Sequence, residues 1–363
     1  MTVETPRFRA VLVHDFNSGN PRRWLEWHEL AAPLREHPWL PPDSAYIGST
    51  LLALAEALGP QAPAFRVLVS WWFGSEPILP YVGDDVIVFC LGDGFARKPS
   101  YSHDVRLVAK THGVTRRPSL SLGDPPTWPA LLPTLLQETR AQWIRLPAAL
   151  RSMARTARRG RRATFVEIPL GTYLLSEVPF VSFDSRIYDI SFAGSVRNDG
   201  EERRRVLPRK TRSRRRMMQT LEDLQADHPA IRVGIKAFDV FGQAREHEAG
   251  YSERMMQTRL APCPRGGYLE TYRLFEAAAS GCVPIVEGLP HRPYYKDCPA
   301  IQIRSWTQLF RLAPSLLADR DQLRLRHEAV LKWWKTRCSA EATAARIAEA
   351  LDRPAVDARL SSG

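Results

Sequence analysis

The chain has 363 residues, of which 44% are hydrophobic and 25% are charged. This length exceeds what one small core needs and suits two domains, while the composition excludes a disordered chain. The 5 cysteines are odd in number and form no CxxC pair, which argues against a disulfide framework and against a zinc site.

Short apolar segments rich in Val, Ile and Phe alternate with helical segments in the first half of the chain. Such alternation predicts a parallel sheet flanked by helices. An Ala- and Leu-rich segment predicts a helix over Ser49–Leu58, and a longer helical segment runs from about Pro129 to Arg159. The predicted strands are Arg9–Val13, Arg66–Trp71, Asp85–Cys90, Val105–Ala109 and Ala163–Ile168.

A second series of the same kind begins at Tyr188. Its predicted helices are Glu201–Ala226, Tyr251–Thr258 and Thr271–Ser280, and two or three further helices follow from Trp306 to Leu351. Its predicted strands are Tyr188–Gly194, Ile231–Ala237, Arg259–Pro262, Val283–Val286 and Ala300–Ile303.

Two such series predict an α/β protein with two Rossmann-like domains and C-terminal helices. We expect an N-terminal domain over 1–170, a linker over 171–187, a second domain over 188–338 and a C-terminal helix and tail over 339–363. Ligands of open α/β sheets bind beyond the carboxyl ends of the strands. The active site is therefore expected in a cleft between the two domains.

The first residues predict no targeting segment. The apolar run Ala10–Val13 is too short for a signal peptide and is followed by His14 and Asp15, and no segment reaches the roughly 18 apolar residues of a membrane span. We expect a cytoplasmic protein, with a peripheral position at the inner face of the cell membrane as an option.

The net charge of +12 is concentrated in two Arg-rich runs, Arg151–Arg162 and Arg203–Arg216. Such runs attract phosphates of lipid head groups, nucleic acid or polyphosphate substrates, although they also occur on solvated helix faces. An anionic membrane surface is the partner that we favour. Nucleic acid is less favoured because neither run contains an aromatic residue that could stack on bases.

The segment Leu260–Val286 has the features of a phosphate site. A short strand ends at Pro262, a loop with Arg265, Gly266 and Gly267 follows, and a helix begins near Thr271. Glycines let the backbone approach a phosphate, the helix start offers free N–H groups, and an arginine adds charge-assisted hydrogen bonds. These features predict a diphosphate cradle that needs no metal.

On the following helix, Arg273 and Glu276 lie three residues apart and share a face. Glu276 is placed where a carboxylate could accept both hydroxyls of a ribose. The same residues also fit an ordinary strand–loop–helix unit with a surface salt bridge.

Together these motifs resemble a known family. Cys263-Pro-Arg-Gly266, Tyr272-Arg-Leu-Phe-Glu-Ala277 and Gly281-Cys-Val-Pro-Ile285 are similar, in this order, to the donor-binding signature of exostosin-like glycosyltransferases. Phe192-Ala-Gly194 followed by Arg203–Arg205 resembles the start of that family's C-terminal domain. The likeness extends over roughly 188–295, so it covers less than a third of the chain.

The resemblance implies a GT-B architecture like that of bacterial relatives, with acceptor binding in the first domain and nucleotide-sugar binding in the second. Arg265, Gly266 and Gly267 would hold the diphosphate, Glu276 would hold the ribose, and Arg273 would orient Glu276 or contact phosphate. The donor-binding residues that it implies are Gly194, Ser195, Arg197, Arg265, Gly266, Gly267, Arg273 and Glu276.

The resemblance also implies an inverting, metal-independent transfer of a hexosyl or glycuronosyl group, with no cofactor besides the nucleotide sugar, which we expect to be a UDP-sugar. The acceptor would be a saccharide or lipid-linked hydroxyl in polysaccharide or glycolipid synthesis. The general base is expected at a strand end of the first domain. The candidates are Asp93, then Asp15, then His112, each of which could instead be a turn or capping residue.

Glu270 departs from the family pattern, which has a small hydroxyl residue more often at this place. It could contact the donor sugar or favour the helix start electrostatically. Two other functions stay open: a catalytically inactive nucleotide-binding scaffold on the same fold, and an Arg-rich nucleic-acid-binding protein.

Overall fold

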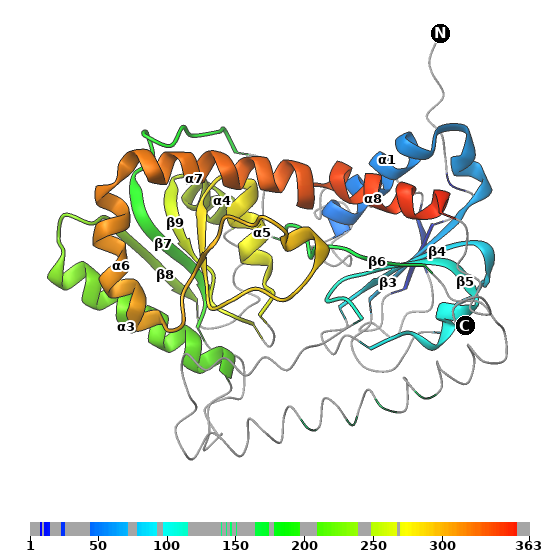
Figure 1. Cartoon of the computed structure of the whole chain (residues 1–363), viewed down its shortest axis with the longest axis horizontal. Helices are drawn as coiled ribbons and strands as arrows, with labels where there is room; N and C mark the ends of the chain where they lie inside the picture. Colours follow the sequence, from blue (N-terminus) through cyan, green and yellow to red (C-terminus); the bar gives the residue numbers. More distant parts are fainter. Residues whose placement is uncertain are drawn as a thin grey trace, which may run out of the picture.

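The computed structural model describes the following residues: 8, 11–14, 23–25, 44–71, 78–92, 97–114, 139, 143, 146, 150, 164–173, 178–196, 209–238, 248–266 and 269–353. Their strands form two separate sheets, one in each of two α/β units that lie side by side (Figure 1). The two-unit α/β prediction is thereby confirmed.

The first sheet belongs to the N-terminal half and has the order β2-β1-β3-β4-β5-β6. Neighbouring strands are parallel except for the β1–β2 pair. The central strand carries an unbroken buried apolar run, Val86–Leu91, as is usual for parallel strands that are covered on both faces. The strands are β1 Val11–His14, β2 Arg23–Leu25, β3 Arg66–Trp71, β4 Gly83–Leu91, β5 Val105–Lys110 and β6 Thr164–Glu167.

Two helices from opposite ends of the chain cover one face of this sheet. They are α1, Ser44–Leu58, and α8, Ala340–Asp352, whose apolar residues share one buried core with β3, β4 and β5. The Tyr46 hydroxyl donates to the Cys338 carbonyl, 2.7 Å away, which fixes the start of α8 against α1. Short 3₁₀ segments lie at Gly59–Ala64 and Ser100–His103.

The second sheet has the order β11-β10-β9-β7-β8, and all its pairs are parallel. Helix α3 packs against α6, and α5 packs against α7 (Figure 1). The strands are β7 Tyr188–Ser195, β8 Val233–Phe238, β9 Thr258–Pro262, β10 Val283–Val286 and β11 Ile301–Gln302. The helices are α3 Arg209–Asp227, α4 Glu248–Met256, α5 Tyr272–Ala279, α6 Trp306–Ala318 and α7 Arg320–Trp333, with a 3₁₀ turn at Pro293–Tyr295.

The C-terminal helices join the two units. Side chains of Ser305, Asp319 and Ser339 accept hydrogen bonds from the first-turn N–H groups of α6, α7 and α8, and therefore define where each helix begins. Between α7 and α8 a π-helical turn spans Trp334–Cys338. Trp334 packs against the cores of both units, and α7 and α8 run along one side of the molecule from one unit to the other (Figure 1).

Most predicted elements are present with shifted ends. Helix α1 begins at Ser44 rather than Ser49, and α4 spans Glu248–Met256 because Thr258 already belongs to β9. The short strand β2 was not predicted, since three residues are too few for a periodic pattern. Of the helix expected from about Pro129 to Arg159, positions 139, 143, 146 and 150 are described, and each is helical. No helix in the described part of the chain is long and apolar enough to cross a membrane.

Candidate functional site

The strand order of the second sheet defines where a ligand can bind. The chain starts at β7, places β8 on one side of it, and then crosses to β9 on the other side. Connections that leave in opposite directions open a crevice at the carboxyl ends of the two strands where the order reverses. This switch point lies between the ends of β7, at Ser195, and β9, at Pro262, where the sequence places the donor motifs.

The end of β7 is fastened by the Arg-rich helix. Ser195 is buried, and the guanidinium of Arg214 in α3 donates to its backbone carbonyl and to its hydroxyl, the latter at 2.9 Å. Arg214 belongs to the second Arg-rich run. At least one arginine of this run therefore supports the switch point instead of facing solvent.

Arg273 of α5 reaches across to the same strand. Its guanidinium donates to the Ala193 carbonyl and lies over the rings of Phe192 and Tyr251, 4.4 and 5.3 Å from their centroids. A Cβ at Gly194 would overlap this guanidinium. Glycine at 194 therefore lets α5 and β7 approach each other at the switch point.

Glu276 is buried and held by two hydrogen bonds. The Tyr251 hydroxyl donates to Oε2 at 2.5 Å, and the Tyr173 backbone N–H donates to Oε1 at 3.1 Å. Burial raises the pKa of the Tyr251 hydroxyl well above its ordinary value, so this hydroxyl stays protonated and acts as the donor. Each carboxylate oxygen offers two lone pairs, and Glu276 can accept further hydrogen bonds from a ligand.

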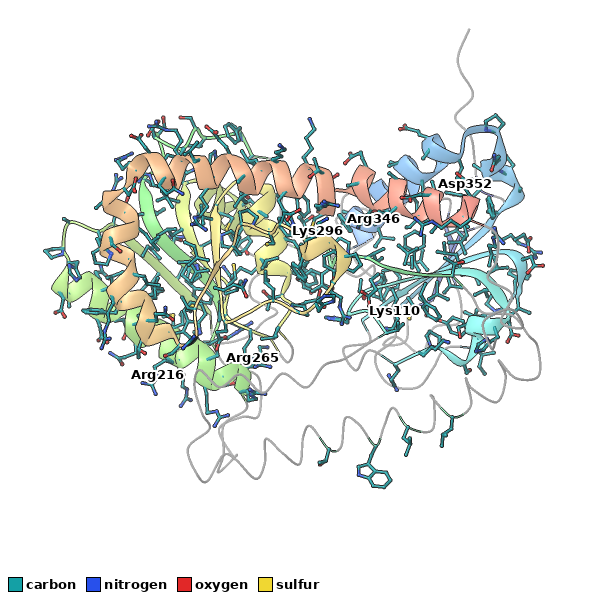
Figure 2. The ribbon with its side chains drawn as sticks, viewed as in Figure 1. Lys110, Arg216, Arg265, Lys296, Arg346 and Asp352 are labelled. Atoms are coloured by element: carbon teal, nitrogen blue, oxygen red, sulfur yellow. The ribbon has the colours of Figure 1, made fainter. Side chains whose placement is uncertain are left out.

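The loop after β9 is anchored to α3 through a shared carboxylate. The Arg265 N–H donates to Glu287 Oε2 at 3.2 Å, and the same oxygen accepts from the Ser213 hydroxyl at 2.5 Å. The indole N–H of Trp306 in turn donates to Ser213, 2.9 Å away. In Figure 2 Arg265 and Arg216 of α3 lie at the same end of the second unit. Positive charge from the loop and from α3 is therefore concentrated beside the switch point.

A second polar cluster joins the donor loop to the first unit. His112 follows β5, and its Nδ1 lies 3.3 Å from Oε2 of Glu270, which precedes α5. The Tyr294 hydroxyl donates to the other carboxylate oxygen of Glu270. The three side chains come from different segments: two from the second unit and one from the first.

An ion pair beside this cluster fastens the loop that carries His112. Arg292 donates to Glu167 Oε1 at 3.0 Å and also to the backbone carbonyl of His112. Gly113, with φ 61°, lies so close beneath this pair that a Cβ there would overlap both charged groups. The end of β6 and the end of β5 are thus both linked to the second unit.

The cluster favours the charged form of Glu270. Burial alone would raise the pKa of this carboxyl group, but hydrogen bonds from His112 and Tyr294 and the charge of Arg292 together hold its pKa below the ordinary value. Burial and the neighbouring Glu270 charge raise the pKa of the Tyr294 hydroxyl, which therefore donates and does not ionise. At neutral pH Glu270 is a carboxylate that accepts hydrogen bonds from both neighbours.

The residues predicted for the site fall into two groups. The structure brings Gly194, Ser195, Arg265, Gly266, Arg273 and Glu276 to one end of the second sheet, and it places His112 against the donor loop. Asp93, Asp15, Arg197 and Gly267 lie outside the described residues.

Sequence reasoning missed the partners that hold these side chains. They are distant along the chain, and no local pattern marks them, although Arg214 lies within a run that the charge pattern identified. The missed residues are Glu167, Tyr251, Glu287, Arg292 and Tyr294, together with the positioning role of Arg214.

Comparison with protein families agrees with the motif order. Residues 206–340 match the family model described as the RXYLT1 C-terminal domain, which is related to exostosin-like glycosyltransferases. The second unit carries a glycosyltransferase-like domain. The matched region includes the donor loop, α5 and the C-terminal helices up to the start of α8. A search of curated proteins found no significant match.

Two solved structures share a similar course of the chain. One is the GtfA/B complex, with 12% identity and a TM-score of 0.37, and the match covers 75% of this chain and 58% of that one. The other is the pneumococcal O-GlcNAc transferase GtfA in complex with UDP and GlcNAc, with 10% identity, a TM-score of 0.37, and coverage of 75% and 57%. This chain therefore spans less than two thirds of either neighbour's length.

Proposed function

We propose that the protein is a glycosyltransferase that binds a nucleotide sugar at the switch point of its second unit. The observation that carries this proposal is the convergence of Arg265, Arg273 and Glu276 at the carboxyl ends of β7 and β9, the place where the topology predicts a ligand. The family match over the same region supports the glycosyltransferase class.

In the proposed reaction the acceptor hydroxyl attacks the anomeric carbon while the nucleoside diphosphate departs. Arg265 and the N–H groups at the start of α5 stabilise the charge of the departing diphosphate, so that no metal is needed. Glu276 accepts hydrogen bonds from the ribose hydroxyls, and Arg273 keeps Tyr251 and α5 in place around it. A single displacement of this kind inverts the anomeric configuration.

Among the three base candidates we favour His112. Its support is its position: it follows a strand of the first unit and contacts Glu270 of the donor loop. We further propose a UDP-sugar as the donor, with a hexosyl or glycuronosyl group, and a saccharide or lipid-linked acceptor from polysaccharide or glycolipid synthesis. The preference for UDP rests on the family resemblance.

Thermal unfolding with a panel of nucleoside diphosphates and nucleotide sugars, with and without EDTA, tests the donor site. A ligand that binds only the native state raises the melting temperature by mass action. We expect a shift with one nucleotide family that EDTA does not remove and that both Arg265→Ala and Glu276→Ala abolish. Absence of a shift with every nucleotide would remove this proposal.

We also propose that the protein docks on an anionic membrane surface from the cytoplasmic side. Arg215 and Arg216 are exposed on α3, and Trp143, Leu146 and Leu150 are exposed at helical positions that precede the first Arg-rich run. Exposed apolar side chains next to basic residues are typical of segments that bind membrane surfaces.

Co-sedimentation with vesicles tests this docking. We expect binding to vesicles that contain anionic lipid and none to neutral vesicles, with weaker binding for Arg215→Glu combined with Arg216→Glu. Equal binding to both kinds of vesicle would contradict the proposal. Tighter binding to nucleic acid than to anionic vesicles at the same salt concentration would favour the nucleic-acid alternative.

A further inference from the structure

We infer that Glu270 is a positioning residue that, together with Tyr294, orients His112 as the general base, so that the catalytic base is assembled across the two units. This inference rests on the proposed function and deepens it. It concerns the cluster His112–Glu270–Tyr294, which the donor site itself does not require.

The geometry is that of a carboxylate held between two donors. Glu270 is buried, its Oε2 lies 3.3 Å from Nδ1 of His112, and its Oε1 accepts from the Tyr294 hydroxyl. Since Tyr294 also lies in the buried core of the second unit, the carboxylate has little freedom to turn away from the imidazole. Its orientation is thereby fixed by the second unit.

The carboxylate determines which ring nitrogen carries the proton. An ionised Glu270 only accepts hydrogen bonds, so Nδ1 of His112 must donate and therefore carries the hydrogen. In this tautomer Nε2 has the basic lone pair. A buried carboxylate behind Nδ1 also stabilises the imidazolium that forms once Nε2 has taken a proton, as the aspartate does in serine proteases.

The backbone around His112 is held in an uncommon conformation. His112 has φ 57° and Gly113 has φ 61°, both in the left-handed region, where a non-glycine residue is rare. The hydrogen bond from Arg292 to the His112 carbonyl and the Arg292–Glu167 ion pair fasten this turn. Strained conformations that the surroundings fix in this way are often part of functional sites.

In the resulting step Nε2 of His112 removes the proton of the acceptor hydroxyl while that oxygen forms its bond to the anomeric carbon. The bond from the anomeric carbon to the phosphate oxygen breaks, and the nucleoside diphosphate leaves with the electron pair. Glu270 stays ionised throughout and acts only through His112. The proton passes from the imidazolium to solvent after the products have left.

Nitrogen NMR of the protein labelled with ¹⁵N in its 9 histidines tests the orientation without any substrate. The His112 signals are identified by their loss in His112→Gln. We expect neutral His112 to show a protonated Nδ1 and an unprotonated Nε2. In Glu270→Gln the amide can turn its NH₂ group toward Nδ1, and this tautomer should lose its dominance.

Glu167→Gln is the matched control, because it removes a charge from the same interface but leaves the groups around the imidazole in place. Those groups are Glu270, Tyr294, Tyr295, Cys338 and Arg292. The tautomer should be unchanged in this control. A protonated Nε2 in the wild-type protein, or an unchanged tautomer in Glu270→Gln, overturns the inference.

Release of nucleoside diphosphate from the donor that the thermal panel identifies, with water or saccharide as acceptor, supplies the second readout. We expect kcat to fall by at least about tenfold in Glu270→Gln with an unchanged donor Kd, because positioning acts on the base and not on donor binding. Donor binding with undiminished kcat in both Glu270→Gln and His112→Gln overturns this inference and leaves the proposed function standing. Failure of every nucleotide to bind overturns the proposed function, while the NMR result still decides whether Glu270 orients His112.

Discussion

The donor site and the base cluster are held in different ways. Ser195, Arg265 and Glu276 make their hydrogen bonds to neighbours such as Arg214, Glu287 and Tyr251, all within 188–338. His112 instead lies on the first unit, but its imidazole and its backbone carbonyl contact Glu270 and Arg292 of the second. One unit can therefore hold the donor side chains in place almost alone, whereas the base is oriented only when the two units meet.

This difference separates binding from chemistry. Changes within the second unit should alter donor affinity, whereas changes at the cluster between the units should alter turnover at constant affinity. Variants that affect the two quantities separately would sharpen the comparison. Variants that always affect both together would break it.

The largest effect is expected for His112→Gln. Loss of a general base lowers kcat by about 100-fold or more, and the donor Kd should stay unchanged because the imidazole does not belong to the donor site. Steady-state release of nucleoside diphosphate combined with calorimetric titration of the donor measures both quantities. His291→Gln, at an exposed position, is the control. If donor affinity fell together with kcat, the two sites would not be separable.

Glu276→Gln should weaken donor binding by about 10- to 100-fold, since a hydrogen bond to a charged group contributes roughly 1.5–3 kcal/mol. Tyr251→Phe should weaken it less, because it removes only the hydroxyl that holds the carboxylate. Calorimetric titration of both variants with the donor checks this order. A larger loss in Tyr251→Phe than in Glu276→Gln would show that Glu276 has a structural role alone.

Gly194→Ala tests the close approach of α5 to β7. The added Cβ overlaps the Arg273 guanidinium, so we expect a loss of about 1–3 kcal/mol in the free energy of unfolding, as for other overpacked sites. Urea denaturation measures it. Gly250→Ala is the matched control, because it lies in α4 with nothing within 4 Å of the new Cβ and should leave stability equal or slightly higher. Equal effects of the two changes would contradict the packing argument.

The smallest effect concerns acid stability. The folded state lowers the pKa of Glu270 through its hydrogen-bond partners, so its charged form contributes stability that is complete above the ordinary glutamate pKa of about 4.3. This contribution disappears as the pH falls through the lower folded-state pKa. Between about pH 5 and pH 3, Glu270→Gln should therefore lose less stability than the wild-type protein in thermal unfolding. Parallel pH profiles of the two proteins would count against the charged cluster.

Local pattern was sufficient to predict most of the architecture. Buried runs such as Val86–Leu91 are short, β-branched and bounded by turn residues, and their strands formed nearly where periodicity placed them. The donor loop could also be located, because glycine, arginine and a helix start follow one another within a few residues of Pro262.

What sequence could not supply is contact between distant segments. Glu270 stood out as a departure from a family pattern, but nothing local indicates that it meets His112 or that Tyr294 supports it. Arg214 likewise looked like one of many surface arginines until the fold placed it against Ser195. Such pairings depend on how the two units and their helices pack, and that information is spread over the whole chain.

Calorimetric titration of the protein with nucleoside diphosphates and nucleotide sugars tests the central claim most directly, namely that the switch point between β7 and β9 is a nucleotide-sugar site. The account predicts saturable binding of one nucleotide family that is lost in Arg265→Ala and retained in Arg320→Ala, an exposed arginine of α7. Equal binding by both variants, or no binding by the wild-type protein, would contradict it.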